Sequence, residues 1–117
     1  MNPLRPAAVP PGMSESIDPS RPKPMRATCD GVTIAESDAT VLVEGNHYFP
    51  ADAVRWELMT LTSTKTICPW KGLASYYDVD VSGVVQPRAA WSYRRPLPWI
   101  RRIGGRVAFA GAVRVHR

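Results

Sequence analysis

The sequence predicts an all-β fold: a compact, curved β-barrel or sandwich-like domain with one or two short helical turns. Short runs of β-branched and aromatic residues alternate with turn residues through most of residues 25–117. Only the segments that follow Pro50 and Pro96 favour helical turns. Eight or nine short strands with little helix are typical of a barrel or sandwich, and they leave the strand order open.

The first 24 residues differ from the rest and predict a disordered, proline-rich leader. Seven of the twelve prolines of this 117-residue chain lie in residues 1–24, and bulky apolar residues are almost absent there. Such a segment cannot offset the entropy that it would lose on ordering. We therefore expect residues 25–117 to form a single domain with one modest core.

The start of the domain favours a meander of three antiparallel strands. Asp30-Gly31 separates two short β-prone runs at residues 26–28 and 32–36, which is a strong hairpin signal. Ser37-Asp38 makes a second turn, and residues 40–44 follow as the third strand.

The pattern changes around Pro50. Residues 45–50 interrupt the strands, and residues 51–54 favour one helical turn. Residues 55–61 alternate in the manner of a strand, with a short helix that continues from Pro50 as the alternative. Residues 62–64, Thr-Ser-Thr, then predict a turn.

Residues 66–68 and 73–81 predict two strands that flank a kink. Pro69 cannot donate a backbone hydrogen bond, so the first strand must end, bulge or lie at an edge there. Gly72 then permits a bend. Alternation separates the second strand into two faces, one with Leu73, Ser75, Tyr77, Val79 and Val81, the other with Ala74, Tyr76, Asp78 and Asp80.

The last third favours short elements. Residues 84–85 and 89–93 predict strands, separated because Pro87 blocks easy pairing. Residues 96–103 are apolar and basic and favour one or two helical turns. The remaining apolar runs, residues 106–109 and 112–115, predict a closing hairpin.

The kink gathers side chains that strand patterning alone does not require. Cys68, Trp70 and Lys71 bring together a thiol, an indole and an ammonium group. An ammonium group held near the sulfur would favour the thiolate and lower the pKa of the thiol. The alternatives are a buried structural cysteine, a packing tryptophan and a solvated lysine.

We expect a pocket centred on Cys68 and Lys71 that binds or modifies a small anionic or electrophilic molecule. Cys68 would be a nucleophile activated by Lys71 or by His47, and His47 would act as a base or proton relay. The ligand would contact Glu44, Tyr48, Arg55, Trp56, Trp70, Tyr76 and Trp91. Neither of the two cysteines belongs to a CxxC pair, so we expect no metal and no cofactor.

Charge suggests two alternative functions. Residues 86–117 contain eight arginines and no acidic residue. With Trp91, Tyr93 and Trp99 as stacking surfaces, residues 86–117 would bind nucleic acid or a nucleotide. The alternative is that these arginines only balance the negative charge of the middle of the domain. A partner-binding module, such as a homodimer or a module with the leader as a docking arm, is the second alternative. No run of eighteen apolar residues is present, so we expect a cytoplasmic protein without a membrane span.

Several motifs resemble a small, mostly bacterial family known as domain of unknown function number 427, sometimes labelled nucleotidyltransferase-like. They are VEGNHYFP at residues 43–50, VRWE at 54–57, TICPWKG at 66–72, ASYY at 74–77, AWSY at 90–93 and GRVAF at 105–109. The resemblance implies a compact, curved β domain with a concave face and assigns no catalytic roles. Asp78-Val79-Asp80 has the spacing of a metal-binding carboxylate pair, but Asp-x-Asp is a weak motif.

Overall fold

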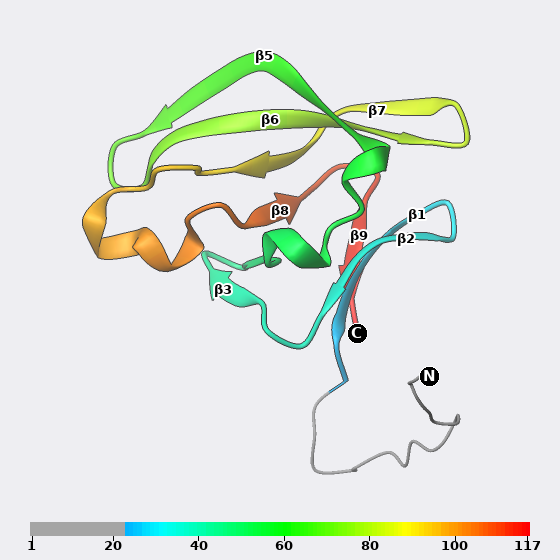
Figure 1. The fold of residues 1–117 in the computed structure, drawn as a ribbon, viewed down its shortest axis with the longest axis horizontal. Helices are drawn as coiled ribbons and strands as arrows, with labels where there is room; N and C mark the ends of the chain where they lie inside the picture. The colour runs from blue at the N-terminus through cyan, green and yellow to red at the C-terminus, as the bar shows by residue number, and fades with distance from the viewer. Residues whose placement is uncertain (1–22) are drawn as a thin grey trace.

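The computed structural model describes residues 23–117, so the predicted leader lies outside the described residues except for its last two positions. Figure 1 shows how the elements are arranged. The strands of the described part are β1 (Met25–Cys29), β2 (Val32–Ser37), β3 (Val41–Val43), β4 (Asn46–Tyr48), β5 (Met59–Cys68), β6 (Gly72–Val81), β7 (Val84–Ser92), β8 (Val107–Phe109) and β9 (Arg114–His116). Three short 3₁₀ helices join them: η1 (Ala51–Ala53), η2 (Trp56–Leu58) and η3 (Pro98–Ile103).

The strands form three open antiparallel sheets. Their orders are β2-β1-β9, β3-β4 and β5-β6-β7-β8. The predicted all-β fold with short helical turns is confirmed, but no closed barrel forms in the described part of the chain. No helix within residues 23–117 is long and apolar enough to cross a membrane.

The hairpin predicted at Asp30-Gly31 is present, but the three-stranded meander is wrong. β1 pairs with β2 across a turn in which Asp30 and Gly31 both have positive φ. β3 pairs with β4 instead, across a second turn of this kind at Glu44-Gly45. Positive φ at two central residues closes a tight hairpin. The chain therefore reverses after β3, and residues 46–48, expected to interrupt the strands, become β4.

The strand predicted at residues 55–61 is present only from Met59 onward, and the turn predicted at residues 62–64 is wrong. A 3₁₀ turn, η2, comes first, and β5 then runs without interruption to Cys68. The Thr-Ser-Thr segment stays in the strand as an irregularity of the β5–β6 pairing. The Thr62 hydroxyl donates a hydrogen bond of 2.9 Å to the Tyr76 carbonyl, so a side chain replaces a ladder bond that the bulge removes.

The break predicted at Pro87 is a bulge inside one long strand, β7. Arg88 has a φ of 52°, and the β6–β7 register shifts between Tyr77 and Val79. The Arg88 backbone N–H donates to Asp78 Oδ1 at 2.8 Å. Proline is tolerated within sheets at bulges, where the ladder bond is already missing. Asp78 thus has a structural role at the bulge.

The closing hairpin is also wrong, because its two strands belong to different sheets. β8 pairs with β7, whereas β9 pairs with β1. The link between them is held by a hydrogen bond of 2.9 Å from the Ala110 N–H to the Ala89 carbonyl. The chain therefore crosses from the four-stranded sheet to the three-stranded sheet in its last residues (Figure 1).

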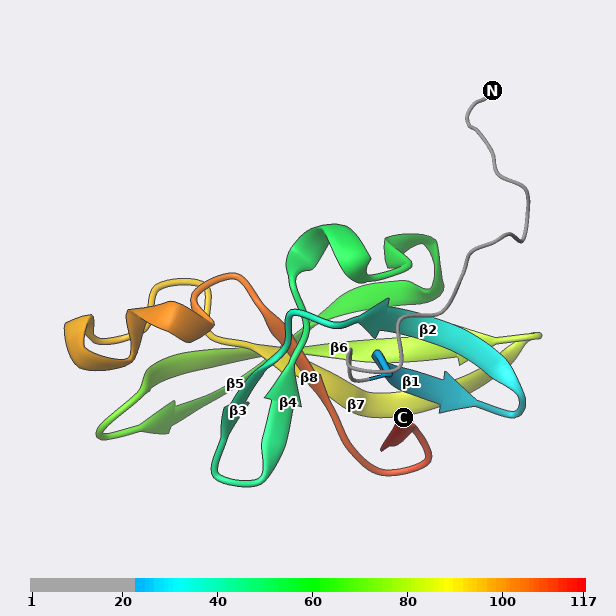
Figure 2. The same cartoon turned by 90° about the horizontal axis from the view of Figure 1, so that it is seen from below.

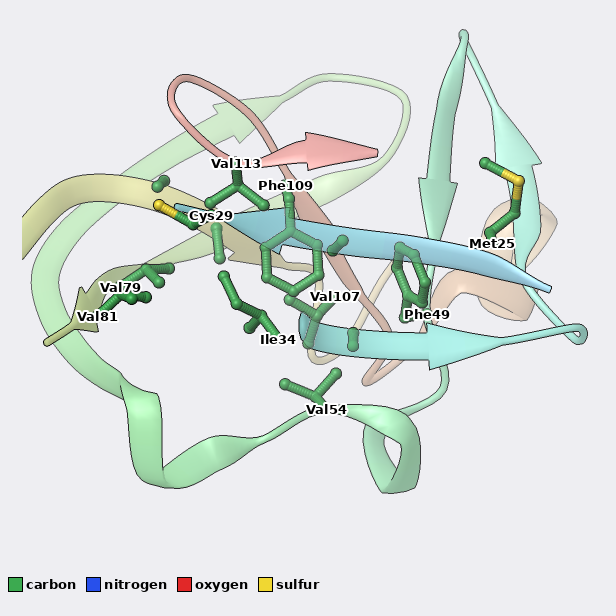
Figure 3. Packing of buried hydrophobic residues seen from close by; sticks show 14 residues of the cluster. Met25, Cys29, Ile34, Phe49, Val54, Val79, Val81, Val107, Phe109 and Val113 are labelled. Carbon is green, nitrogen blue, oxygen red and sulfur yellow. The ribbon is translucent and has the colours of Figure 1, made fainter. Parts of the chain in front are cut away.

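The larger of two hydrophobic cores lies under β1 and β2 (Figure 3). Phe49 and Phe109 meet edge to face at its centre, with ring centroids 5.6 Å apart. The labelled members of this first core are Met25, Cys29, Ile34, Phe49, Val54, Val79, Val81, Val107, Phe109 and Val113.

A second core lies toward the other end of the four-stranded sheet. Its buried members are Val43, Tyr48, Ala74, Tyr93, Ile100, Ile103 and Ala108. β6 contributes to both cores from opposite faces, with Val79 in the first and Ala74 in the second. Figure 1 and Figure 2 show the consequence: η3 and the β5–β6 turn lie at one end of the molecule, and the β1–β2 hairpin lies at the other.

We expect Phe49→Ala to lower the free energy of unfolding by about 3–5 kcal/mol, because it leaves a cavity in the first core. Leu42→Ala is the matched control, since Leu42 is 59% exposed and should change stability by less than about 1 kcal/mol. Urea denaturation followed by tryptophan fluorescence measures both. Equal losses in the two variants would contradict the assigned core.

Candidate functional site

The predicted kink at Pro69 is the turn of the β5–β6 hairpin. Cys68 pairs with Gly72, and the Lys71 N–H donates to the Cys68 carbonyl at 3.1 Å. Gly72 has a φ of 117°, where a side chain would be strained. Two hydrogen bonds fix the turn to the segment around η3: the Leu97 N–H to the Lys71 carbonyl at 2.9 Å, and Trp99 Nε1 to the Trp70 carbonyl at 2.8 Å.

Lys71 is buried, with only 7% of the residue exposed, and its ammonium group forms an ion pair with Glu44. The Nζ atom also lies 5.3 Å from the ring centroids of Trp70 and Tyr93, within the range of cation–π attraction. Glu44 reaches it from the β3–β4 turn, where it has a φ of 53°. The left-handed backbone at Glu44 costs about 1 kcal/mol and places the carboxylate beside the lysine.

The surroundings of Lys71 keep it charged. Burial alone would lower the pKa of Lys71, but the hydrogen bond to Glu44 and the nearby Tyr48, Tyr93 and Glu44 groups outweigh burial and raise that pKa. Burial also raises the pKa of Tyr93, against the opposing effect of Lys71. The charge of Lys71 is therefore already compensated inside the protein, which argues against its predicted role as the holder of an anionic ligand.

Aromatic contacts extend this cluster along β4, β6 and β7. Tyr48 and Trp91 meet edge to face at 6.5 Å, and Trp91 Nε1 donates to the Tyr48 hydroxyl at 3.3 Å. The ring centroids of Tyr76 and Trp91 lie 6.4 Å apart. Cys68 is half-buried and packs against the second core. Seven predicted site residues thus come together: Glu44, Tyr48, Cys68, Trp70, Lys71, Tyr76 and Trp91. They form a packed cluster, and none of them lines the cavity described below.

Three other predicted site residues lie apart from this cluster. His47 has its Nδ1 atom 2.9 Å from the Thr40 hydroxyl, and strand alternation puts it on the opposite face of β4 from the buried Tyr48. Arg55 pairs with Glu57 at 2.9 Å, and Trp56 meets Tyr77 edge to face near the first core. No interaction in the described part of the chain joins His47 to Cys68, so the geometry does not support the expected nucleophile–base pair.

A basic pocket, which the sequence analysis missed, lies beside the β5–β6 hairpin. Its volume is about 320 Å³, and its lining consists of Lys65, Leu73, Ser75, Arg94 and Arg95. Cross-strand pairing aligns Lys65 with Ser75 and Ser75 with Ser92, and both serines are buried. Lys65 Nζ donates to the Ser75 hydroxyl at 3.2 Å. In the sequence, only the Arg94-Arg95 pair after β7 pointed to this pocket. Which residues of β5 and β6 lie beside it depends on the register of these strands, which the sequence does not reveal.

Comparison with known proteins finds one family model. A family described as Domain of unknown function (DUF427) matches residues 17–117, which covers most of the chain and all of its described residues. The match confirms the resemblance that the motifs indicated. No curated protein matches the sequence.

We expect Glu44→Gln to lower the free energy of unfolding by about 1–2 kcal/mol, because it leaves the Lys71 ammonium group buried without its carboxylate. Lys71→Met removes the charge and keeps an apolar chain of similar length. The double variant should lose less than the sum of the two single losses, as measured by urea denaturation. Strictly additive losses would contradict the coupling.

The stabilisation that the Lys71 ammonium group contributes should depend on pH. The pKa of Lys71 is raised in the folded protein, so its contribution is complete below the ordinary value of 10.5 and is lost as pH rises through the folded value. Wild-type stability should therefore fall more steeply above about pH 10.5 than that of Lys71→Met. Parallel curves for the two proteins would contradict this assignment.

Alkylation of the native protein should modify Cys68 before Cys29. Burial raises the pKa of the Cys29 thiol, and the charge of Asp30 raises it further, whereas Cys68 is only partly buried. Mass spectrometry after iodoacetamide treatment measures both sites, with Cys68→Ser as the control for assignment. Preferential modification of Cys29 would contradict the expected order.

Proposed function

The chain belongs to the family of Domain of unknown function (DUF427), and we propose that it binds a small molecule through an anionic group, such as a phosphate or carboxylate. The observation that carries this proposal is the composition of the basic pocket. Three cationic side chains, Lys65, Arg94 and Arg95, line a cavity of about 320 Å³ that has no acidic residue in its lining. We therefore keep the expected anionic ligand and propose that it binds in the basic pocket, not at Lys71.

The cations of this pocket are available to a ligand. Among residues 23–117, the ion pairs involve Arg26, Arg55 and Lys71, and none involves Lys65, Arg94 or Arg95. Arginine presents a planar fork of donors that matches the two oxygens of a carboxylate or phosphate group. Uncompensated cations around a concave site are the arrangement that attracts such anions.

The floor of the pocket adds a fixed hydroxyl group. Ser75 is buried on β6, with Lys65 on one side and Ser92 on the other across the sheet. The backbone of a central strand holds these positions, so the polar atoms of the floor are ordered before a ligand arrives. Preorganisation of this kind reduces the entropy lost on binding.

The geometry favours binding over metal-dependent nucleotide transfer. Asp78 and Asp80 each accept a hydrogen bond from a backbone N–H, of Arg88 and Gly83 respectively. Within residues 23–117, no group of three His, Cys, Asp or Glu side chains is arranged to hold a metal ion. Nucleotide transfer uses carboxylates that position magnesium against the triphosphate.

Nucleic-acid binding is a second candidate, favoured by one local feature. Trp99 is 65% exposed and stands on η3 beside the exposed Arg101 and Arg102, which combines a stacking surface with positive charge. Arg88 at the β7 bulge and Arg114 on β9 belong to other elements and do not extend this feature along η3. A short single-stranded oligonucleotide with steep salt dependence of binding would identify this function.

We expect inorganic phosphate to shift the backbone amide resonances of Leu73 and Ser75 in a saturable NMR titration. The double variant Arg94→Gln/Arg95→Gln should weaken the apparent affinity at least about tenfold, because charge-assisted hydrogen bonds are lost. The double variant Arg88→Gln/Arg114→Gln changes the net charge equally and should bind like the wild type. Equal weakening in both variants, or no saturable shift in the wild type, would contradict the proposal.

A further inference from the structure

We infer that the ligand of the basic pocket is an amphipathic anion, with an apolar chain or ring attached directly to its charged group. This inference rests on the proposed anion site and names the class of molecule that it takes. The observation that carries it is an apolar shelf, formed by Ile67 and Leu73, that adjoins the cationic residues.

The shelf and the polar floor of the pocket lie on the same face of the β5–β6 hairpin. Ile67 pairs with Leu73, and two positions along the strands Lys65 pairs with Ser75. Residues two apart on a strand project to the same side, so the apolar pair lies next to the polar pair. Leu73 itself lines the pocket, which makes the shelf continuous with the anion site.

The shelf is open, although the far end of the same face of β6 is covered. Ile67 is 78% exposed and Leu73 is 48% exposed. Farther along the same face of β6, Val79 and Val81 are buried in the first core. The protein therefore covers the apolar face at one end of β6 and leaves it open at the end where the cations gather.

The size of the pocket also exceeds the need of a simple anion. A cavity of about 320 Å³ has room for roughly ten water-sized groups, given about 30 Å³ for each. A phosphate or carboxylate group fills only part of this space. Positive charge at Arg94 and Arg95 selects the charged end of the ligand, and contact with Ile67 and Leu73 removes its apolar end from water.

A series of soluble monoalkyl phosphates, compared with inorganic phosphate, tests this inference on the full chain. We expect the affinity of the wild type to rise about two- to fourfold for each added methylene group until the shelf is covered. Isothermal titration calorimetry below the aggregation threshold of each compound gives the affinities. Sedimentation of the ligand-free and ligand-bound protein shows whether a second copy covers the shelf instead.

Two variants and one control locate the contact. Ile67→Thr and Leu73→Thr introduce a good strand-forming residue and should abolish most of the increase with chain length. Ile67 lies outside the lining of the anion site, so Ile67→Thr should also bind inorganic phosphate as the wild type does. Val84→Thr makes the same kind of exposed substitution at the distant β6–β7 turn and should keep the increase. Circular dichroism confirms that each variant is folded, and the wild-type series tests the inference without any variant.

The outcomes separate this inference from the proposed function. Phosphate binding with no dependence on chain length would overturn the amphipathic ligand and leave the anion site intact. A chain-length dependence that survives in both shelf variants, or a dimer that Ile67→Thr dissociates, would also overturn it. Failure of inorganic phosphate and of every alkyl phosphate to bind would overturn the anion site itself.

Discussion

The ion pair between Glu44 and Lys71 joins the two hairpins on which the second core depends. Each partner comes from a tight turn, β3–β4 for Glu44 and β5–β6 for Lys71. Around the ammonium group, Trp70 and Tyr93 supply aromatic faces, and Glu44 supplies the compensating charge. A buried charge with no partner would be costly, so formation of the pair requires the two turns to arrive together. The positive φ of Glu44, which closes the β3–β4 turn, also places its carboxylate beside the lysine.

Fixing this turn also positions the basic pocket on the other face of the sheet. The Lys71 carbonyl accepts a hydrogen bond from the Leu97 N–H, and the Trp70 carbonyl accepts one from Trp99. These bonds hold the segment that follows Arg94 and Arg95 against the end of the β5–β6 hairpin. The predicted cluster thus acts as the support of a neighbouring site, and its members stabilise the walls that carry the charged lining.

The sequence analysis found the correct hairpin for the candidate site but the wrong face. Strand alternation correctly separated Leu73 and Ser75 from Ala74 and Tyr76 on β6. The site was then assigned to the thiol, the phenols and the lysine because they combine several reactive groups within a few residues. In the structure these residues are packed together in and around the second core. Lys65 has an ordinary sequence context, and only the register of β5 on β6 and the course of the chain after β7 bring it and the Arg94-Arg95 pair to one cavity.

Local physical chemistry in the sequence by itself determined the all-β class, the Asp30-Gly31 hairpin, the short helical turns after Pro50 and Pro96, and the family. These features depend on backbone preferences and alternation over a few residues, which neighbouring side chains reveal. Tertiary structure decided the pairing of β3 with β4, the separation of β8 from β9 and the location of the basic pocket. Each of these depends on which distant strand covers a given face, and burial and charge compensation across the whole domain settle that choice.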